Sequence, residues 1–180
     1  VLAAYYKGDT LELLRTGFKP VPADLLSKVV PFGSVLTLPA TGSEMNKGAV
    51  VSYGKGKFPV SSDVAFPKFS VLEPELTYTL PKIQVANGVI DSFVHIAEQY
   101  LTYPVDAKVQ DRFSEGLLQT LIEIGKTTIE EPENYDARAN LVWSATLALN
   151  GLIGTGVPQV LQFLGAGLDH HRPGLQPELP

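Results

Sequence analysis

Residues 79–103 read TLPKIQVANGVIDSFVHIAEQYLTY, and this stretch decides the fold of the chain. Pro81 opens a helix at its first turn, where a missing backbone N–H costs nothing. The apolar residues that follow recur at spacings of three and four, which predicts one buried helix face made of Val89, Phe93, Ile96 and Tyr100. The opposite face is predicted to carry Gln84, Gly88, Asp91, His95 and Glu98.

Asp91 and His95 are four residues apart on this helix, so their side chains lie one above the other. A carboxylate and an imidazole placed in this way can bind one divalent metal when other elements complete the coordination shell. The same spacing occurs on solvated helix faces, where the two side chains only share a hydrogen bond. The spacing alone favours that second interpretation.

The composition excludes several classes of protein and site. A net charge of −5 and the lack of any basic run argue against nucleic-acid binding. The chain has no cysteine, which excludes disulfides, a thiolate nucleophile and any cysteine-based zinc site. No apolar run is long enough to span a bilayer, and no signal peptide is recognisable, so we expect a soluble, cytoplasmic protein. Any histidine chemistry must use His95, His170 or His171.

Short strand patterns precede the helix at 79–103. Residues 34–38 (SVLTL) predict a buried strand, which Pro39 stops. Residues 40–46 (ATGSEMN) follow directly, and strand ends of this kind bind ligands in α/β proteins. The alternative interpretation, which composition favours, is a turn leading to a helix N-cap. Residues 49–53 and 57–61 predict a hairpin, in which Lys57 is either a solvated cation or a contact to a phosphate or ribose.

The remaining patterns separate an α/β portion from a helical one. Residues 69–72 predict a further strand, and after Pro81 only helical periodicity is present, at 105–128 and 136–150. Residues 165–180 are rich in glycine and proline, which predicts an irregular tail. His170 and His171 are then either tail residues of no consequence or metal ligands.

Several segments together closely resemble the iron-containing (group III) alcohol dehydrogenase family, above all its butanol dehydrogenase and NADPH-dependent aldehyde reductase branch. The matching segments are LTLPATGSE (36–44), LEPELTYTLP (72–81), QVANGVIDSFVHIAEQY (84–100), PVDAKVQDRF (104–113), EPENYDARAN (131–140) and ALNGLIGTGVPQ (148–159). The resemblance extends from the first residues to about Gln159.

The resemblance implies a fold and a domain division. The fold is an α/β part, a partial Rossmann-like nucleotide-binding domain, followed by an all-α part of dehydroquinate synthase type. Residues 1–80 would be the C-terminal portion of the dinucleotide-binding domain and residues 81–159 part of the helical metal-binding domain. Residues 160–180 would be the irregular tail.

The resemblance also implies site residues, because the family binds iron or zinc through an aspartate, a histidine four residues later and two further histidines. It assigns the divalent metal (Fe or Zn) to Asp91, His95 and His170. It assigns contacts to the cofactor, NADP or NAD, to Thr37, Leu38, Thr41, Asn46, Lys57 and Leu76. It assigns no catalytic protein nucleophile.

Three departures from the family pattern lead us to expect an internal piece of a longer enzyme, truncated at both ends. The family's Gly-Gly-Gly-Ser phosphate turn would lie before Val1, residues 160–164 lack the expected third histidine, and the sequence after His170 resembles nothing in the family. The 180 residues alone are therefore expected to be weakly active or inactive.

The function implied is hydride transfer between NAD(P)H and a short-chain aldehyde or alcohol, in a homodimer. An alternative of another class is a non-catalytic remnant that serves as an interaction or dimerisation module. A metal-dependent lyase of the related dehydroquinate synthase or glycerol dehydrogenase branches is a third interpretation, which LTLPATGSE and EPENYDARAN disfavour.

Overall fold

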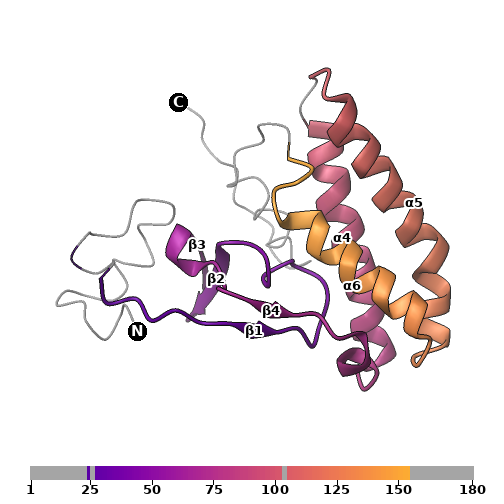
Figure 1. Ribbon diagram of the computed structural model, residues 1–180, viewed down its shortest axis with the longest axis horizontal. Helices are drawn as coiled ribbons and strands as arrows, with labels where there is room; N and C mark the ends of the chain where they lie inside the picture. Colours follow the sequence, from indigo (N-terminus) through magenta and orange to yellow (C-terminus); the bar gives the residue numbers. More distant parts are fainter. Residues whose placement is uncertain (1–23, 25–26, 103–104, 155–180) are drawn as a thin grey trace.

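The computed structural model describes residues 24, 27–102 and 105–154. Three long helices lie together on one side of this part of the chain, and two small strand pairs lie on the other side (Figure 1). The helices are α4 (Lys82–Thr102), α5 (Lys108–Glu130) and α6 (Tyr135–Leu149). They confirm the three helices predicted from periodicity.

Each of the three helices contacts the other two, and their shared apolar core holds them together. The buried members of this core are Val85, Ile96, Leu121, Leu141, Ala148 and Ile153. Asn134 begins α6, because its side-chain oxygen accepts a hydrogen bond from the backbone N–H of Ala137. The short 3-10 helix η2 (Pro74–Thr77) leads into α4 and packs against α6.

The strands form two separate pairs. β1 (Ser34–Val35) is parallel to β4 (Ser70–Val71), and β2 (Gly48–Tyr53) is antiparallel to β3 (Gly56–Ser61). The β2–β3 turn contains Gly54, whose φ of +58° is a conformation that favours glycine. A 3-10 helix, η1 (Asp63–Ala65), follows β3.

The predicted hairpin is therefore confirmed, whereas the strand predicted at 34–38 is shorter than expected. β1 ends at Val35, although the backbone N–H of Leu36 still donates to the carbonyl of Val71. Beyond this point the chain turns toward the helices, where Pro39 and Ala40 contact α4.

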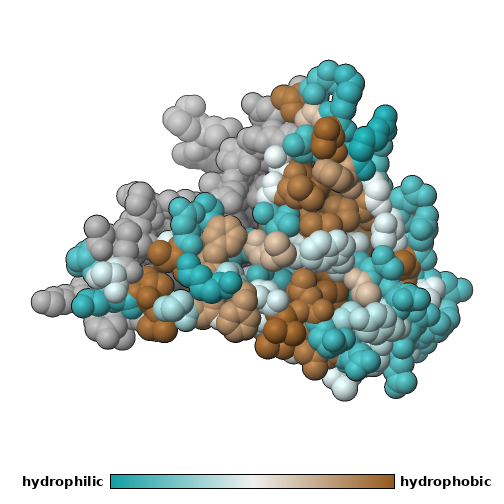
Figure 2. Space-filling model, in the orientation of Figure 1, coloured by the Kyte–Doolittle hydropathy of each residue, from teal (hydrophilic) through white to brown (hydrophobic). Residues whose placement is uncertain are grey.

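The buried face of α4 differs from the predicted one. Ile96 is buried as expected, but Phe93 and Tyr100 are exposed, and His95 on the predicted polar face is buried. The reason is a second contact: α5 and α6 cover one side of α4, and the loop after β1 covers another. Figure 2 accordingly shows apolar side chains reaching the surface over the helices as well as over their junction with the strands.

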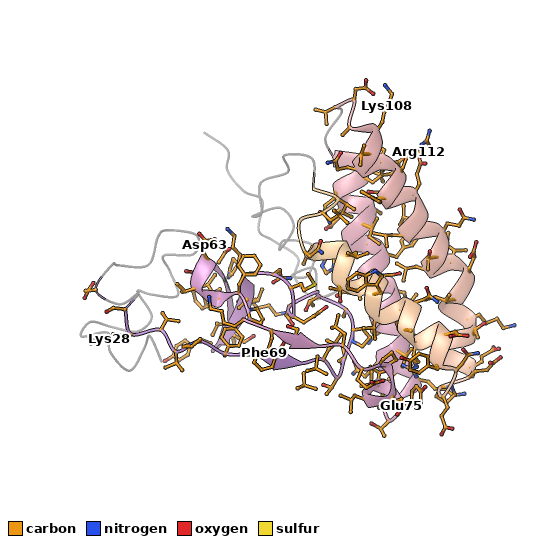
Figure 3. The ribbon with its side chains drawn as sticks, viewed as in Figure 1. Lys28, Asp63, Phe69, Glu75, Lys108 and Arg112 are labelled. Atoms are coloured by element: carbon orange, nitrogen blue, oxygen red, sulfur yellow. The ribbon has the colours of Figure 1, made fainter. Side chains whose placement is uncertain are left out.

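The two ends of the helical layer are polar. Lys108 and Arg112 project from the first turns of α5, and Glu75 of η2 lies at the opposite end of the layer (Figure 3). None of the helices in the described part is long and apolar enough to cross a membrane. The predicted tail and His170 lie outside the described residues.

Candidate functional site

Asp91 and His95 project from the middle of α4 on the side that faces the loop after β1. His95 is 1% exposed, and the side chain of Asp91 is 33% exposed. His95 Nδ1 lies 3.8 Å from Asp91 Oδ2, which is too long for a hydrogen bond. Two ligands of one tetrahedral zinc ion, each about 2.1 Å from it, lie about 3.4 Å apart, so the observed separation suits a shared ion.

The environment of His95 also fits a metal. Both ring nitrogens are buried, and within the described part of the chain neither has a hydrogen-bond partner. Leaving a buried polar group unpaired costs about 1–3 kcal/mol, and native structures rarely do so. A cation bound at one nitrogen would remove part of this cost, so the donor set suits Zn²⁺ or Fe²⁺.

Glu98 is a third acidic group on this side of α4 and is half-buried. Burial raises the pKa of its carboxyl above the ordinary value; His95 opposes that rise, and the negative charge of Asp91 adds to it. Among residues 24, 27–102 and 105–154, however, no group of three His, Cys, Asp or Glu side chains is arranged to hold a metal ion. A metal ion held by Asp91 and His95 would therefore need further ligands.

Gln99 fixes α4 to α6 beside His95. Its side-chain nitrogen donates to the backbone carbonyl of His95 and to that of Ala148, each at 2.7 Å. Because Gln99 is buried, these bonds are shielded from water. The backbone that carries His95 is consequently held against the third helix.

The loop after β1 lies directly on α4. A side chain at Gly88 would place its Cβ 2.3 Å from the carbonyl oxygen of Pro39, so only glycine permits this approach. One turn later, Ser92 Oγ donates to the carbonyls of Gly88 and Ala40. Gly88 and His95 are seven residues apart and share a face of the helix. The loop and the Asp91–His95 pair are therefore neighbours along one side of α4.

Internal hydrogen bonds shape the same loop. Asn46 Nδ2 donates to the carbonyl of Thr41 at 2.9 Å, and Asn46 Oδ1 accepts from the backbone N–H of Gly48 at 3.1 Å. Gly42 has a φ of +61°, and a Cβ there would lie 3.3 Å from backbone oxygens of α6. The loop is thus wedged between α4 and α6 in a defined conformation.

Among the predicted cofactor contacts, Asn46 is buried and the others are exposed. Thr37, Leu38 and Thr41 are exposed on the loop, and the amide of Asn46 donates to the carbonyl of Thr41. Lys57 is exposed on β3, and Leu76 is exposed in η2. Glu44 was not predicted as a site residue, yet it is 4% exposed and accepts a hydrogen bond from Thr146 of α6. The one feature of the sequence that could have indicated its importance is its position in the LTLPATGSE segment, which carries the family resemblance.

No protein-family model matches the chain. It is 55% identical over 172 residues to NADPH-dependent aldehyde reductase YqhD of Escherichia coli (strain K12), a match covering 90% of this chain and 43% of that protein. It is 44% identical over 160 residues to NADH-dependent butanol dehydrogenase A of Clostridium acetobutylicum, covering 87% of this chain and 40% of that protein.

Solved structures agree with these relatives. The crystal structure of E. coli K-12 YqhD superposes with a TM-score of 0.79 at 51% identity, covering 94% of this chain and 45% of that chain. The chain is similar to an aldehyde reductase and a butanol dehydrogenase, and its structural neighbours have the iron-containing alcohol dehydrogenase fold. NADH-dependent butanol dehydrogenase A from Thermotoga maritima, of the same iron-containing dehydrogenase fold, gives a TM-score of 0.74 at 38% identity, covering 83% of this chain and 36% of that chain.

The chain spans less than half the length of these two curated relatives. The expected fold class is confirmed: a small α/β part precedes the helices, and the solved structures that superpose on the chain have the iron-containing alcohol dehydrogenase fold.

Proposed function

We propose that the protein is a metal-dependent alcohol dehydrogenase or aldehyde reductase that transfers hydride between NAD(P)H and a short-chain aldehyde or alcohol. Asp91 and His95 would hold the metal, Fe or Zn, together with His170. The observation that carries the proposal is the buried His95, whose two ring nitrogens have no hydrogen-bond partner in the described part of the chain. The relatives named for NADPH- and NADH-dependent activities support it.

The residues of this chain have distinct tasks in that reaction. When bound, the metal would supply a Lewis acid for the substrate oxygen, and the dinucleotide a hydride donor or acceptor. The carboxylate of Asp91 would offset part of the metal charge, and burial of His95 keeps its ring in one orientation. No protein nucleophile is needed.

The loop after β1 would place the cofactor beside α4. Thr37, Leu38 and Thr41 are its exposed contacts, and the amide of Asn46 holds Thr41 in place. Lys57 would bind a phosphate or ribose, and Leu76 would offer an apolar wall. We further propose the division into residues 1–80, 81–159 and 160–180, a homodimeric assembly and a cytoplasmic location.

Metal binding can be tested on the protein expressed from its intact reading frame. Isothermal titration with Zn²⁺, or anaerobically with Fe²⁺, is expected to give at least about 100-fold weaker binding for D91N and H95Q, because each removes a direct ligand. H170Q should behave alike. H171Q is the matched control, since this adjacent histidine is not assigned to the metal, and E123Q controls for loss of an exposed carboxylate.

The outcomes separate the proposal from its rivals. Retention of wild-type metal affinity in D91N and H95Q would refute the site. Equal losses in H170Q and H171Q would remove His170 from the ligand set. Metal binding without any binding of NADPH or NADH would favour a metal enzyme of another kind.

A second candidate, a non-catalytic interaction or dimerisation module, is favoured by one feature of α4. Four apolar residues lie exposed in a single line along this helix, at spacings of seven, four and seven: Ile83, Ile90, Val94 and Leu101. This candidate is supported over the enzyme if neither metal nor dinucleotide binds and the double variant I90D/L101D dissociates a dimer seen by light scattering. If they bind, it fails.

A further inference from the structure

Glu44 forms a buried connection between the loop after β1 and the third helix. Its side chain is 4% exposed, and its Oε1 accepts a hydrogen bond from Thr146 Oγ1 at 2.5 Å. Thr146 is fully buried on α6, 102 residues further along the chain. The hydrogen bond thus joins two side chains that are both buried.

The backbone of Glu44 connects the loop to the strands as well. Its carbonyl oxygen accepts from Ser70 Oγ at 2.6 Å, and Ser70 Oγ lies 2.8 Å from Ser34 Oγ across the β1–β4 pair. Glu44 therefore connects the β1–β4 pair to α6, through its backbone carbonyl on one side and its side chain on the other.

Glu44 completes a clamp on the segment that contains Thr41. On one side of Thr41, Pro39 and Ala40 rest on Gly88 and Ser92 of α4. On the other side, Glu44 is held by α6. The exposed Thr41 lies between these two fixed points, and its position relative to α4 depends on both.

Stability alone does not explain a carboxyl group at this place. Burying an acidic side chain is costly even when it is hydrogen-bonded, and an apolar side chain of similar size is often at least as stable. A directional hydrogen bond instead fixes one orientation of the loop. An apolar residue would permit several.

We propose that Glu44 is a positioning residue: its bond to Thr146 sets the place of the Thr41–Asn46 segment relative to the Asp91–His95 helix, and so the place of the dinucleotide relative to the metal. This rests on the proposed function. Glu44 is buried and bonded to Thr146, so it would act through the loop.

The test compares three single variants and one double variant of the protein expressed from its intact reading frame. E44M removes the acceptor and keeps the length of the side chain, T146V removes the donor and keeps its shape, and E44Q retains an amide oxygen that can accept. E44M and T146V should each weaken NADPH binding about tenfold, while E44Q should stay within about threefold of wild type. The double variant E44M/T146V should be no weaker than either single variant, because both remove the same bond. Zn²⁺ affinity should change less than twofold in all four.

Amide hydrogen exchange provides a readout that does not depend on cofactor binding. E44M and T146V should accelerate exchange across 41–46 at least tenfold and leave the middle of α5 unchanged. If exchange in 41–46 is unchanged, or if both variants only lower the melting temperature while NADPH binding stays at the wild-type value, the positioning role is wrong. If wild type binds no dinucleotide but exchange responds as expected, the proposed function fails and the loop-positioning role of Glu44 stands.

Discussion

Substituting Gly88 by alanine would separate α4 from the loop that it touches. A Cβ at this position would lie 2.3 Å from the carbonyl oxygen of Pro39, whereas ordinary contacts begin at 3.4 Å, so helix and loop must move apart by about 1 Å. The neighbouring hydrogen bonds, from Ser92 to the carbonyl of Ala40 and from Thr146 to the side chain of Glu44, resist that movement.

The size of the effect follows from two opposing contributions. Alanine is favoured over glycine in a helix by about 1 kcal/mol. Overpacking typically costs about 1–3 kcal/mol, and a clash with backbone lies at the upper end because no rotamer change relieves it. The net loss expected for G88A is therefore about 2 kcal/mol.

Gly116 of α5 offers a matched control, because a Cβ there would meet nothing within 4 Å. G116A should therefore gain about 1 kcal/mol from helix propensity alone. Urea unfolding followed by circular dichroism measures both variants, which should differ by about 3 kcal/mol. Equal unfolding free energies for G88A and G116A would refute the close contact between α4 and the loop.

Three further predictions concern single side chains. H95L should abolish metal binding but not destabilise the metal-free protein, whose unfolding free energy should rise by up to about 1 kcal/mol. The reason is that the substitution removes two buried nitrogens that lack partners in the described part, and calorimetry in EDTA measures the change. Because burial raises the pKa of Glu98, the folded protein keeps this proton to higher pH than the unfolded chain, so the stability contributed by Glu98 is present below about pH 4.3 and lost as pH rises through the folded pKa. E98Q should thus be more stable than wild type at pH 7 and gain nothing at pH 4, and equal gains at both would contradict it. N134A should cost about 1 kcal/mol by uncapping α6, read from its urea midpoint.

The sequence predicted the helices well because their periodicity extends over several turns. It predicted the buried sides less well, since burial depends on partners that are distant in sequence. In α6 the apolar Trp143 is 51% exposed. The charged Arg138 is buried instead, and its Nε donates to the carbonyl of Pro132. Neither outcome follows from apolar spacing.

In the candidate site, too, the sequence predicted the helix face of the residues but not their burial. The spacing of Asp91 and His95 placed them on one side of a helix, but burial of His95 depends on the surrounding tertiary structure, which local spacing does not reveal. Asn46 was predicted as a cofactor contact, and its amide is instead engaged within the loop. Its assignment, like those of Thr37, Leu38, Thr41, Lys57 and Leu76, stays a prediction.

Anomalous X-ray diffraction at the zinc or iron edge, from crystals of the metal-loaded protein, tests the metal site most directly. We expect one strong peak about 2.0–2.2 Å from both a carboxylate oxygen of Asp91 and a ring nitrogen of His95. A peak elsewhere, with the His95 ring bonded to no metal in a saturated crystal, would contradict the site and the dehydrogenase function proposed from it.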